Sequence, residues 1–439
     1  MLRFVLQLIR ANIKVHFNNL LSRKQLLKMT QRRLIRGIRR AYYEVPFYKK
    51  LYDEWGVDID EIKTLDDLRK LPFITKDDVR EQFPNGIVSR KHDIADCHYS
   101  ATTGSTGRSL PFVFTKSTFA FYIATGIRMY TMIGYRPWHK VVYIKYTKIN
   151  YPRIGPFLRT QHIPSTIPVE EQIAMLRNSG VDLLLGYASL VYEIAQKVTP
   201  EDLKTIRPKF IGINSELSTK YQRDFISQVF GCPVYDEYST EETWMVASQC
   251  REGHYHLFID NVWVEFLDKN GNPVKPGEDG EIVLTTTRSN AMPFIRYKIG
   301  DIGRYSDRAC SCGLGYPVLE SFEGRADDSF IMPSGKYVSS LKLLNTFTKY
   351  IKKYLHLMEE FKIIQKEKGF VVIQLVKGRE YNDRHFQEVI DSLNAIFAEP
   401  VTIKVEFVDN IDMKNSIKRK AIESWVRNNE KEPLLTSAV

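Results

Sequence analysis

Residues 101–114 have the sequence ATTGSTGRSLPFVF, which places hydroxyl side chains and glycines in one short turn before an apolar run. Glycines let the backbone turn its N–H groups toward a ligand, and hydroxyls and a cation add further donors. The stretch therefore favours a phosphate-binding loop. It differs from the loop of P-loop NTPases, because its two glycines stand three residues apart and no Lys-Ser/Thr pair follows. A surface turn without a ligand has the same composition and is the alternative at this point.

Around this loop, short apolar runs alternate with helical stretches from about residue 98 to residue 300. Such alternation predicts an α/β body with a largely parallel sheet. Further on, the pattern changes to strands and hairpins between residues 257 and 284, with the turn sequence DKNGN at 268–272. The clearest apolar runs of the body lie at 141–144, 181–185, 210–213 and 233–235.

The C-terminal part has a different pattern, which predicts a small α+β unit. Strands at 361–364 and 370–376 flank a hairpin turn, 383–397 has the spacing of a helix, and 401–408 that of a closing strand. The fold class we expect is α/β, a large multi-layer N-terminal body with an inserted β region and a small C-terminal α+β domain. The domains we expect are basic amphipathic helices at 1–50, the body at 51–325 and the C-terminal domain at 326–439.

The net charge of +11 is concentrated at the N-terminus. Residues 1–50 contain 13 Lys and Arg and a single acid, Glu44, a net charge of +12, so the other residues together carry about −1. Apolar residues interleave with these charges at helical spacing, which predicts amphipathic helices. The alternatives are a solvated helix packed on the domain, weak docking on an anionic membrane or an acidic partner, and RNA binding. The body is not basic, so nucleic acid is not among the partners we expect for it.

Five cysteines in 439 residues are too few for a disulfide scaffold, which favours a reducing compartment and a cytoplasmic protein. Four residues instead form a candidate metal site, because they supply thiolate and imidazole ligands in two short clusters. They are Cys250, His256, Cys310 and Cys312, with His254 as a competing ligand. We expect a closed tetrahedral site that holds a structural Zn²⁺, and the alternative is a set of unrelated buried thiols. No apolar run reaches the ~20 residues needed to span a bilayer.

The loop at 101–109 resembles the phosphate loop of the adenylate-forming (acyl-CoA synthetase) superfamily, usually written SSGTTGKP. Arg108 stands at the Lys position of that pattern and Ser109 replaces the Pro. The chain as a whole resembles the phenylacetate-CoA ligase branch, especially its relatives encoded with capsular polysaccharide genes. Those share a VPFY element, here at 45–48, and an LPxxTKxDxR element, here at 71–80. The resemblance implies Mg²⁺-dependent use of ATP to convert a carboxylic acid to its acyl-AMP, with coenzyme A as the next acceptor.

The segment DEYSTEE at 236–242 resembles the family's Y-G-x-x-E element. The resemblance implies that Tyr238 stacks on adenine and that Glu242 holds Mg²⁺. An aromatic face suits a purine, and a hard cation prefers carboxylate oxygen. Glu241 is the rival metal ligand, and Ser239 replaces the usual glycine.

The segment RYKIGDIG at 296–303 resembles the family's R-Y-x-x-G-D element, which implies that Asp301 accepts hydrogen bonds from the ribose hydroxyls. Arg325, in the segment EGRADD at 323–328, resembles the arginine that joins it. Asp327 and Asp328 lie where the superfamily has the hinge of its mobile C-terminal domain. Asp327 is the first candidate for the pivot and Asp328 is the second.

The family's catalytic lysine corresponds best to Lys418, which would neutralise charge on the α-phosphate during adenylation. Lys414 and Lys420 are rivals for this role, and the alternative is that the segment is a solvated basic tail with no catalytic role. The catalytic candidates are Lys418, Glu242 and Arg108. The candidates for nucleotide binding are Thr102, Thr103, Gly104, Ser105, Thr106, Gly107, Glu216, Tyr238, Ser239, Asp301 and Arg325.

Two other functions compete with CoA ligation. One is adenylyl or acyl transfer to an acceptor other than CoA, such as a sugar amine in polysaccharide biosynthesis. The other is a catalytically idle scaffold at a membrane glycan-assembly complex, which the basic N-terminus and the departures from the family motifs suggest.

Overall fold

The structure is a computed structural model that describes residues 2–102, 110–146, 148, 157–325, 329–354, 357–411 and 421–426. The chain forms two compact units, and each unit combines segments that are distant in sequence. Unit 1 contains Met1–Tyr135 and Glu237–Ser321, and unit 2 contains Arg136–Asp236 and Phe322–Val439. The domain boundaries expected after residues 50 and 325 stay predictions.

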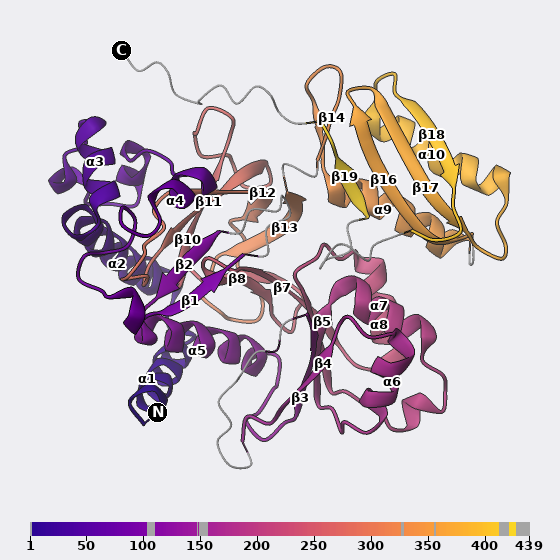
Figure 1. Cartoon of the computed structure of the whole chain (residues 1–439), viewed down its shortest axis with the longest axis horizontal. Helices are drawn as coiled ribbons and strands as arrows, with labels where there is room; N and C mark the ends of the chain where they lie inside the picture. The colour runs from indigo at the N-terminus through magenta and orange to yellow at the C-terminus, as the bar shows by residue number, and fades with distance from the viewer. Residues whose placement is uncertain are drawn as a thin grey trace. The chain divides into compact units, whose positions relative to one another are not determined.

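The helices of unit 1 precede most of its strands (Figure 1). The N-terminal amphipathic helices are confirmed, and α2 begins with a capping box in which Ser22 and Gln25 satisfy each other's backbone N–H groups. Thr75 caps α4 in the same way with Asp78. Among the described residues, no helix combines the length and the apolar character that a membrane span needs. The helices are α1 (Leu2–Asn18), α2 (Arg23–Glu44), α3 (Pro46–Glu54), α4 (Lys76–Gln82) and α5 (Lys116–Met132), with short 3-10 turns at Ile59–Glu61, Asp66–Lys70 and Ile94–Asp96.

The strands of unit 1 pair mainly antiparallel. A separate hairpin joins β1 to β2, and the larger sheet has the order β10-β11-β12-β13-β9-β8-β7. The predicted hairpin around 268–272 is confirmed, because β10 and β11 pair antiparallel on either side of that turn. The strands are β1 (His98–Ala101), β2 (Pro111–Phe114), β8 (Trp244–Gln249), β9 (Tyr255–Leu257), β10 (Val262–Leu267), β11 (Asp279–Thr286), β12 (Tyr297–Ser306) and β13 (Val318–Arg325).

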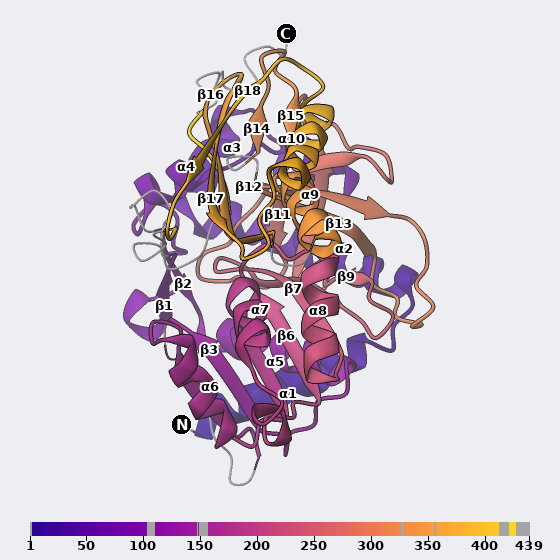
Figure 2. The ribbon, with the colours of Figure 1, turned by 90° about the vertical axis from the view of Figure 1, so that its right-hand side faces the viewer.

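The first part of unit 2 is the predicted α/β layer. Its parallel strands have the order β7-β6-β5-β3-β4, and α6, α7 and α8 cover one face (Figure 2). The apolar run at 141–144 is buried, in keeping with the place of β3 between β5 and β4 in the sheet. The elements are β3 (Val141–Lys145), β4 (Thr160–Pro164), α6 (Val169–Arg177), β5 (Leu183–Tyr187), α7 (Ala188–Lys197), a 3-10 turn (Asp202–Lys204), β6 (Phe210–Asn214), α8 (Lys220–Phe230) and β7 (Val234–Thr240).

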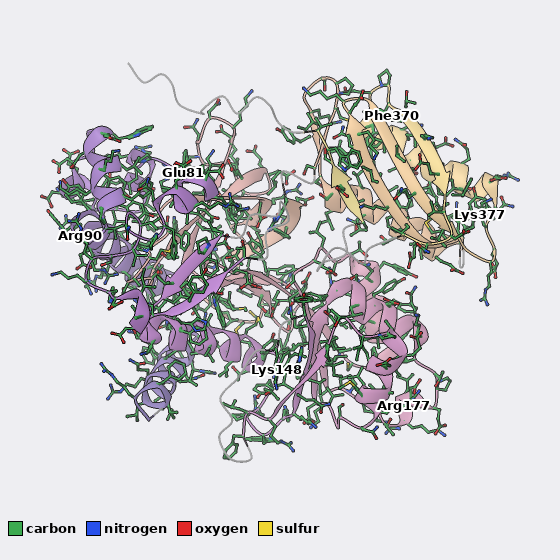
Figure 3. All side chains as sticks on the ribbon, viewed as in Figure 1. Glu81, Arg90, Lys148, Arg177, Phe370 and Lys377 are labelled. Carbon is green, nitrogen blue, oxygen red and sulfur yellow. The ribbon has the colours of Figure 1, made fainter. Side chains whose placement is uncertain are left out.

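The C-terminal part of unit 2 confirms the predicted α+β pattern. The helix expected at 383–397 forms with those bounds, and β17, whose ends Phe370 and Lys377 are labelled in Figure 3, pairs with β16 as the predicted hairpin. The three-residue strand β19 was not predicted, because so short a run has no readable periodicity. The elements are β14 (Phe330–Ile331), β15 (Tyr337–Val338), α9 (Ser340–Lys353), β16 (Met358–Glu367), β17 (Phe370–Lys377), α10 (Asp383–Phe397), β18 (Thr402–Phe407) and β19 (Ile422–Ser424), with the sheet order β18-β17-β16-β19.

A fully buried ion pair lies at the centre of unit 1. Arg128 on α5 donates to Asp260, between β9 and β10, from Nη1 at 2.8 Å and from Nη2 at 3.2 Å. Both side chains are 0% exposed. Asn18 at the end of α1 donates to the same carboxylate at 2.6 Å. Burial by itself would raise the pKa of Asp260, but the charge of Arg128, the hydrogen bonds from Arg128 and Asn18 and the charge of Arg288 together lower that pKa. The pair thereby connects two helices to the strand region.

We expect Asp260→Ala to destabilise the protein by about 3–5 kcal/mol, because it leaves the Arg128 charge buried without a partner. The loss should appear as a lower midpoint in urea or thermal denaturation. Because the folded pKa of Asp260 is lowered, its stabilisation is present above the ordinary Asp pKa of about 3.9 and lost as the pH falls below it.

Two variants control this experiment. Arg128→Met/Asp260→Leu removes both charges and should cost much less than Asp260→Ala. Asp279→Ala breaks the exposed pair with Arg304 and should cost at most about 1 kcal/mol. Equal losses for Asp260→Ala and Asp279→Ala would contradict the importance of the buried pair.

Candidate functional site

The predicted phosphate loop connects the two strands of the β1–β2 hairpin. Thr102 joins the two ends of the loop, because its N–H donates to the Leu110 carbonyl and its Oγ1 accepts from the Leu110 N–H, both at 3.0 Å. Thr103–Ser109, and with them the candidates Thr103, Gly104, Ser105, Thr106, Gly107 and Arg108, lie outside the described residues. The structure therefore places the base of the loop in unit 1.

The predicted base-stacking and ribose-binding residues lie in direct contact. The Tyr238 hydroxyl, on β7, donates to Asp301 Oδ2, on β12, at 2.6 Å, and both side chains are buried. This hydrogen bond fixes the phenol oxygen of Tyr238 against β12. Ser239, the next residue, lies at a register shift between β7 and β8.

Glu242, the predicted Mg²⁺ ligand, accepts a hydrogen bond from a residue of β12, the strand that also carries Asp301. Tyr297, the first residue of β12, donates from its hydroxyl to Glu242 Oε1 at 2.9 Å. Glu242 lies in the turn between β7 and β8 and is buried. One carboxylate oxygen takes this hydrogen bond, and a carboxylate offers a second oxygen to a cation. Sequence reasoning missed Tyr297, although it belongs to the same RYKIGDIG segment that indicated Asp301.

The turn that carries Glu242 is anchored by a residue that no motif indicated. The buried Asn261 side chain donates to the backbone carbonyls of Thr243 at 2.9 Å and Met245 at 2.8 Å. Asn261 directly follows Asp260, whose backbone carbonyl accepts from Thr287 Oγ1 at 2.8 Å. A lone asparagine before a strand carries no sequence signal for this role, because its partners are distant main-chain atoms.

Aromatic contacts connect the loop-bearing hairpin to the Glu242 turn. His98, at the start of β1, stacks on Phe119 of α5 with ring centroids 3.8 Å apart, and Phe119 meets the edge of Trp244 at 5.4 Å. Trp244 lies two residues after Glu242 and has a φ of 60°, a conformation that costs energy for a bulky side chain. Three predicted segments of the nucleotide site therefore belong to one region of unit 1.

The remaining candidates lie in unit 2 or outside the described residues. Glu216, after β6, accepts a hydrogen bond from the Ser189 N–H at 2.9 Å, at the N-terminus of α7. Arg325 ends β13, a strand whose residues from Phe322 onward belong to unit 2, and its carbonyl accepts from the N–H and Oγ of Ser329. Lys414, Lys418, Lys420, Asp327 and Asp328 lie outside the described residues.

A lysine at the carboxyl ends of the parallel strands of unit 2 was also missed by sequence reasoning. Lys145, which ends β3, bonds Asn214 Oδ1 and Ser215 Oγ after β6, and its ammonium lies 4.4 Å from the centre of the Tyr187 ring. Ligands of α/β sheets bind at such strand ends. The signal would have been a single cation that directly follows a buried apolar run.

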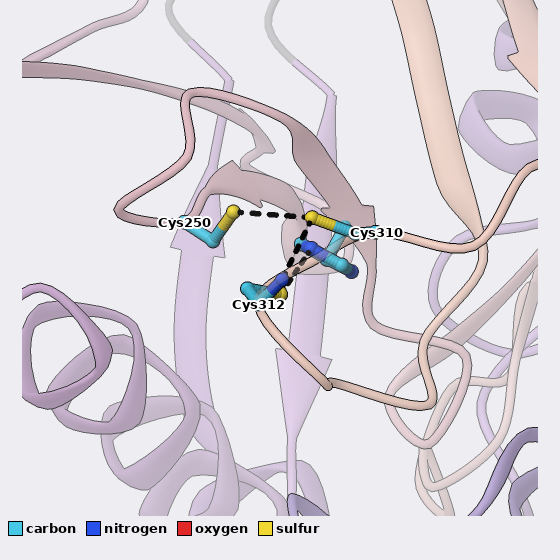
Figure 4. Close-up of side chains that lie close together, drawn as sticks. Cys250, Cys310 and Cys312 are labelled. Atoms are coloured by element: carbon cyan, nitrogen blue, oxygen red, sulfur yellow. Dashed lines mark hydrogen bonds between the residues drawn. The ribbon is translucent and has the colours of Figure 1, made fainter.

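The four predicted metal ligands lie together in unit 1 (Figure 4). Their ligand atoms all lie within 4.8 Å of one another, and Cys250 Sγ is 3.8 Å from Cys310 Sγ. A Zn–S distance of about 2.3 Å implies an S···S separation of about 3.8 Å across a tetrahedral ion. Cys312 Sγ is 3.2 Å from His256 Nε2, so the imidazole points its free nitrogen toward the thiols.

The surroundings of His256 also suit metal binding. Its Nδ1 lies 3.2 Å from the Tyr316 carbonyl, which accepts the Nδ1 proton and leaves Nε2 as the ligand atom. Burial lowers the pKa of His256 and so favours the neutral imidazole that binds metals. The rival His254 is exposed, with its Nδ1 3.3 Å from Cys310 Sγ.

Comparison with known proteins gives three relationships. The CapK C-terminal domain family model matches residues 330–424. Phenylacetate-coenzyme A ligase of Thermus thermophilus is 27% identical over 330 residues, which cover 71% of this chain and 73% of that protein. Protein CapK of Staphylococcus aureus is 26% identical over 272 residues, 58% of each chain. The resemblance to the phenylacetate-CoA ligase branch and its capsular polysaccharide relatives is confirmed.

The fold is likewise similar to a solved structure. The 2-hydroxyisobutyryl-CoA ligase in its postadenylation state superposes with a TM-score of 0.75 at 19% identity, over 90% of this chain and 88% of that one. The predicted fold class, that of adenylate-forming enzymes, is confirmed.

Proposed function

We propose that this chain, a relative of the phenylacetate-CoA ligases, is an AMP-forming acid ligase that activates a carboxylic acid with ATP. The observation that supports the proposal most is the contact of Tyr238 with Asp301, at 2.6 Å in unit 1. Two segments that resemble nucleotide-binding motifs, 63 residues apart in sequence, meet there through their predicted functional side chains.

The proposed reaction begins with in-line displacement at the α-phosphate of ATP. A carboxylate oxygen of the acid forms a bond to the α-phosphorus, the bond from that phosphorus to the bridging oxygen breaks, and pyrophosphate leaves with the bonding electrons. The products are acyl-AMP and pyrophosphate. Charge accumulates on the phosphate oxygens, so catalysis needs positioned donors and cations.

Each candidate residue of unit 1 has a separate role in the proposed reaction. Asp301 accepts hydrogen bonds from the ribose hydroxyls, Tyr238 stacks on the base, and the loop at 102–108 donates to the phosphates, with Arg108 as its cation. Glu242 would hold Mg²⁺, which neutralises phosphate charge when bound. Tyr297 orients the Glu242 carboxylate through Oε1.

Other residues of the chain take supporting roles in this proposal. Lys418 supplies the positive charge for the α-phosphate, and Arg325 is a candidate for binding the ribose. Glu216 is retained as a candidate for nucleotide binding. The hinge of the C-terminal domain is assigned to Asp327.

Coenzyme A is the proposed acceptor in the second step. The sulfur of the CoA thiol forms a bond to the acyl carbon and its proton passes to water. The bond from that carbon to the phosphate oxygen then breaks, so a thioester forms and AMP leaves with the bonding electrons. A second candidate acceptor, which the sequence also left open, is an amine on a sugar. Incubation of the protein with acid, ATP and CoA distinguishes the two, because only the first acceptor yields an acyl-CoA thioester.

We also propose that Cys250, His256, Cys310 and Cys312 bind one structural Zn²⁺. Three thiolates and one imidazole form a closed tetrahedral set, which is typical of structural and not of catalytic zinc. The ion would join the loop after β8 to the segment before β13.

We expect Asp301→Ala to weaken ATP·Mg²⁺ binding by about tenfold to a hundredfold, the scale of losing charged hydrogen bonds. Isothermal titration calorimetry measures the change, and Asp279→Ala, which removes an exposed carboxylate, is the matched control. An unchanged affinity would overturn the ribose assignment. If the unsubstituted protein binds no ATP, the scaffold alternative is favoured.

Lys418→Ala should lower pyrophosphate release by about 10²–10³-fold while ATP still binds, because only the transition state loses a charge contact. Release is measured over a panel of aromatic, fatty, hydroxy and amino acids, which also identifies the substrate. Lys414→Ala and Lys420→Ala are the controls. If one of them, and not Lys418→Ala, abolishes release, the catalytic role belongs to that lysine.

The purified protein should contain about one zinc ion per chain, and Cys312→Ser should reduce this content and the melting temperature together. Elemental analysis gives the content. Cys232→Ser, at a buried thiol outside the cluster, should leave the zinc content unchanged. Zinc far below one per chain in the unsubstituted protein would contradict the site.

A further inference from the structure

Helix α1 has two apolar faces, and the structure buries only one of them. Leu8 and Val15 lie on the buried face, which packs against α5, where Phe4 also stacks on Phe119. His16 Nε2 makes a hydrogen bond of 2.9 Å with Thr131 Oγ1 of α5. These contacts fix the helix on unit 1 and determine which side chains face outward.

The outward face carries a row of large apolar side chains, which we call the apolar stripe. Its residues recur every three or four positions, so they form one line along the helix and the turn that follows. Each is between 46% and 80% exposed. A single exposed apolar residue is ordinary, but a contiguous row marks an interaction surface. The stripe consists of Leu6, Ile9, Ile13, Phe17 and Leu20.

A row of cations borders the stripe. Arg3, Arg10 and Lys14 are exposed, and by helical spacing they lie along one flank of the stripe. The first acid in the chain is Glu44, the last residue of α2. No carboxylate of α1, or of α2 before Glu44, therefore compensates these cations. The outward side of α1 is therefore apolar and cationic at once.

Positive charge continues inward from this flank. The nearby Arg288 charge, partial burial and the Arg33 charge lower the pKa of Lys14. Among the described residues, Arg33 Nη1 and Arg288 Nε and Nη2 are buried without a hydrogen-bond partner. Asp260 also faces these cations, but it is already bonded to Arg128. These buried cations therefore add to the positive charge behind the exposed cations of α1.

We propose that α1 docks the protein on an anionic membrane surface, with the apolar stripe at the boundary of the acyl chains and the flanking cations at the lipid phosphates. A helix with one apolar and one cationic side lies parallel to the membrane surface, with its apolar face about 5–10 Å into the boundary between headgroups and acyl chains. Charge complementarity selects the partner, because anionic headgroups match Arg3, Arg10 and Lys14. A second copy of the chain fits less well, since a twofold contact would bring these cations against one another.

Vesicle co-sedimentation with the full chain tests the proposal. We expect binding to vesicles of phosphatidylcholine with about one third phosphatidylglycerol, no binding to phosphatidylcholine alone, and weaker binding as salt screens the charges. Ile13→Asp/Phe17→Asp should reduce binding at least tenfold, because it places two charges in the apolar stripe. Trp55→Asp/Trp138→Asp, at two exposed tryptophans outside α1, should leave binding unchanged.

A charge-reversal pair tests the cations separately. Arg10→Glu/Lys14→Glu changes the net charge by −4 and should also reduce binding at least tenfold. The fold should tolerate it, because the new carboxylate at position 14 would stand close to the Arg288 charge that now lowers the pKa of Lys14. Lys269→Glu/Lys275→Glu changes the net charge equally in the exposed β10–β11 turn and should have little effect.

Three results would overturn the proposal. They are absence of vesicle binding by the unsubstituted chain, unchanged binding by Ile13→Asp/Phe17→Asp, and a stable dimer in light scattering that this double variant dissociates. Pyrophosphate release in solution should stay unchanged in the stripe variant, since α1 supplies no residue to the proposed nucleotide site. Failure of membrane docking is thereby separated from failure of the proposed reaction.

Discussion

The Arg128–Asp260 ion pair is the interaction on which unit 1 depends. A buried charge pair gains stability from further hydrogen bonds, and here Asn18 donates to the Asp260 carboxylate and the Tyr316 hydroxyl accepts from Arg128 Nη1. The next residue, Asn261, donates to the backbone of the Glu242 turn. The dipeptide Asp260–Asn261 therefore connects α1 and α5 to the candidate site. The hydrogen bonds of Asn261 to the main chain help to position the turn that carries Glu242.

The candidate site uses tyrosines to position carboxylates. Tyr238 donates to Asp301 and Tyr297 donates to Glu242, so each acid is oriented by a phenol on a strand. A buried carboxylate needs such donors, because desolvation otherwise favours its protonated form. Strained backbone at Trp244 and Arg296, both at positive φ, borders the same segments. This cost is typical of sites where structure is maintained for function.

The cationic N-terminus and the candidate nucleotide site are separate features of unit 1. Lys14, Arg33 and Arg288 surround a region in which Asp260 is already neutralised by Arg128. The exposed cations Arg3, Arg10 and Lys14 belong to the proposed docking surface, whereas Tyr238, Asp301 and Glu242 are the buried candidates for the nucleotide site. This separation means that docking and chemistry are expected to respond to different substitutions.

The amino-acid sequence alone was enough to predict the fold class, the elements with strong periodicity such as the helix at 383–397, and the metal and nucleotide candidates. Periodicity and motifs are properties of neighbouring residues, so they can be recognised without the structure. The sequence also indicated the basic N-terminal helices. It could not indicate Tyr297 and Asn261 as partners of the Glu242 turn, or the exposure of Ile13 and its neighbours. Those facts depend on which side chains approach from distant segments and which face of a helix is covered. Only tertiary packing decides them, since hydrogen bonds and burial are made across space and leave no periodic signal along the chain.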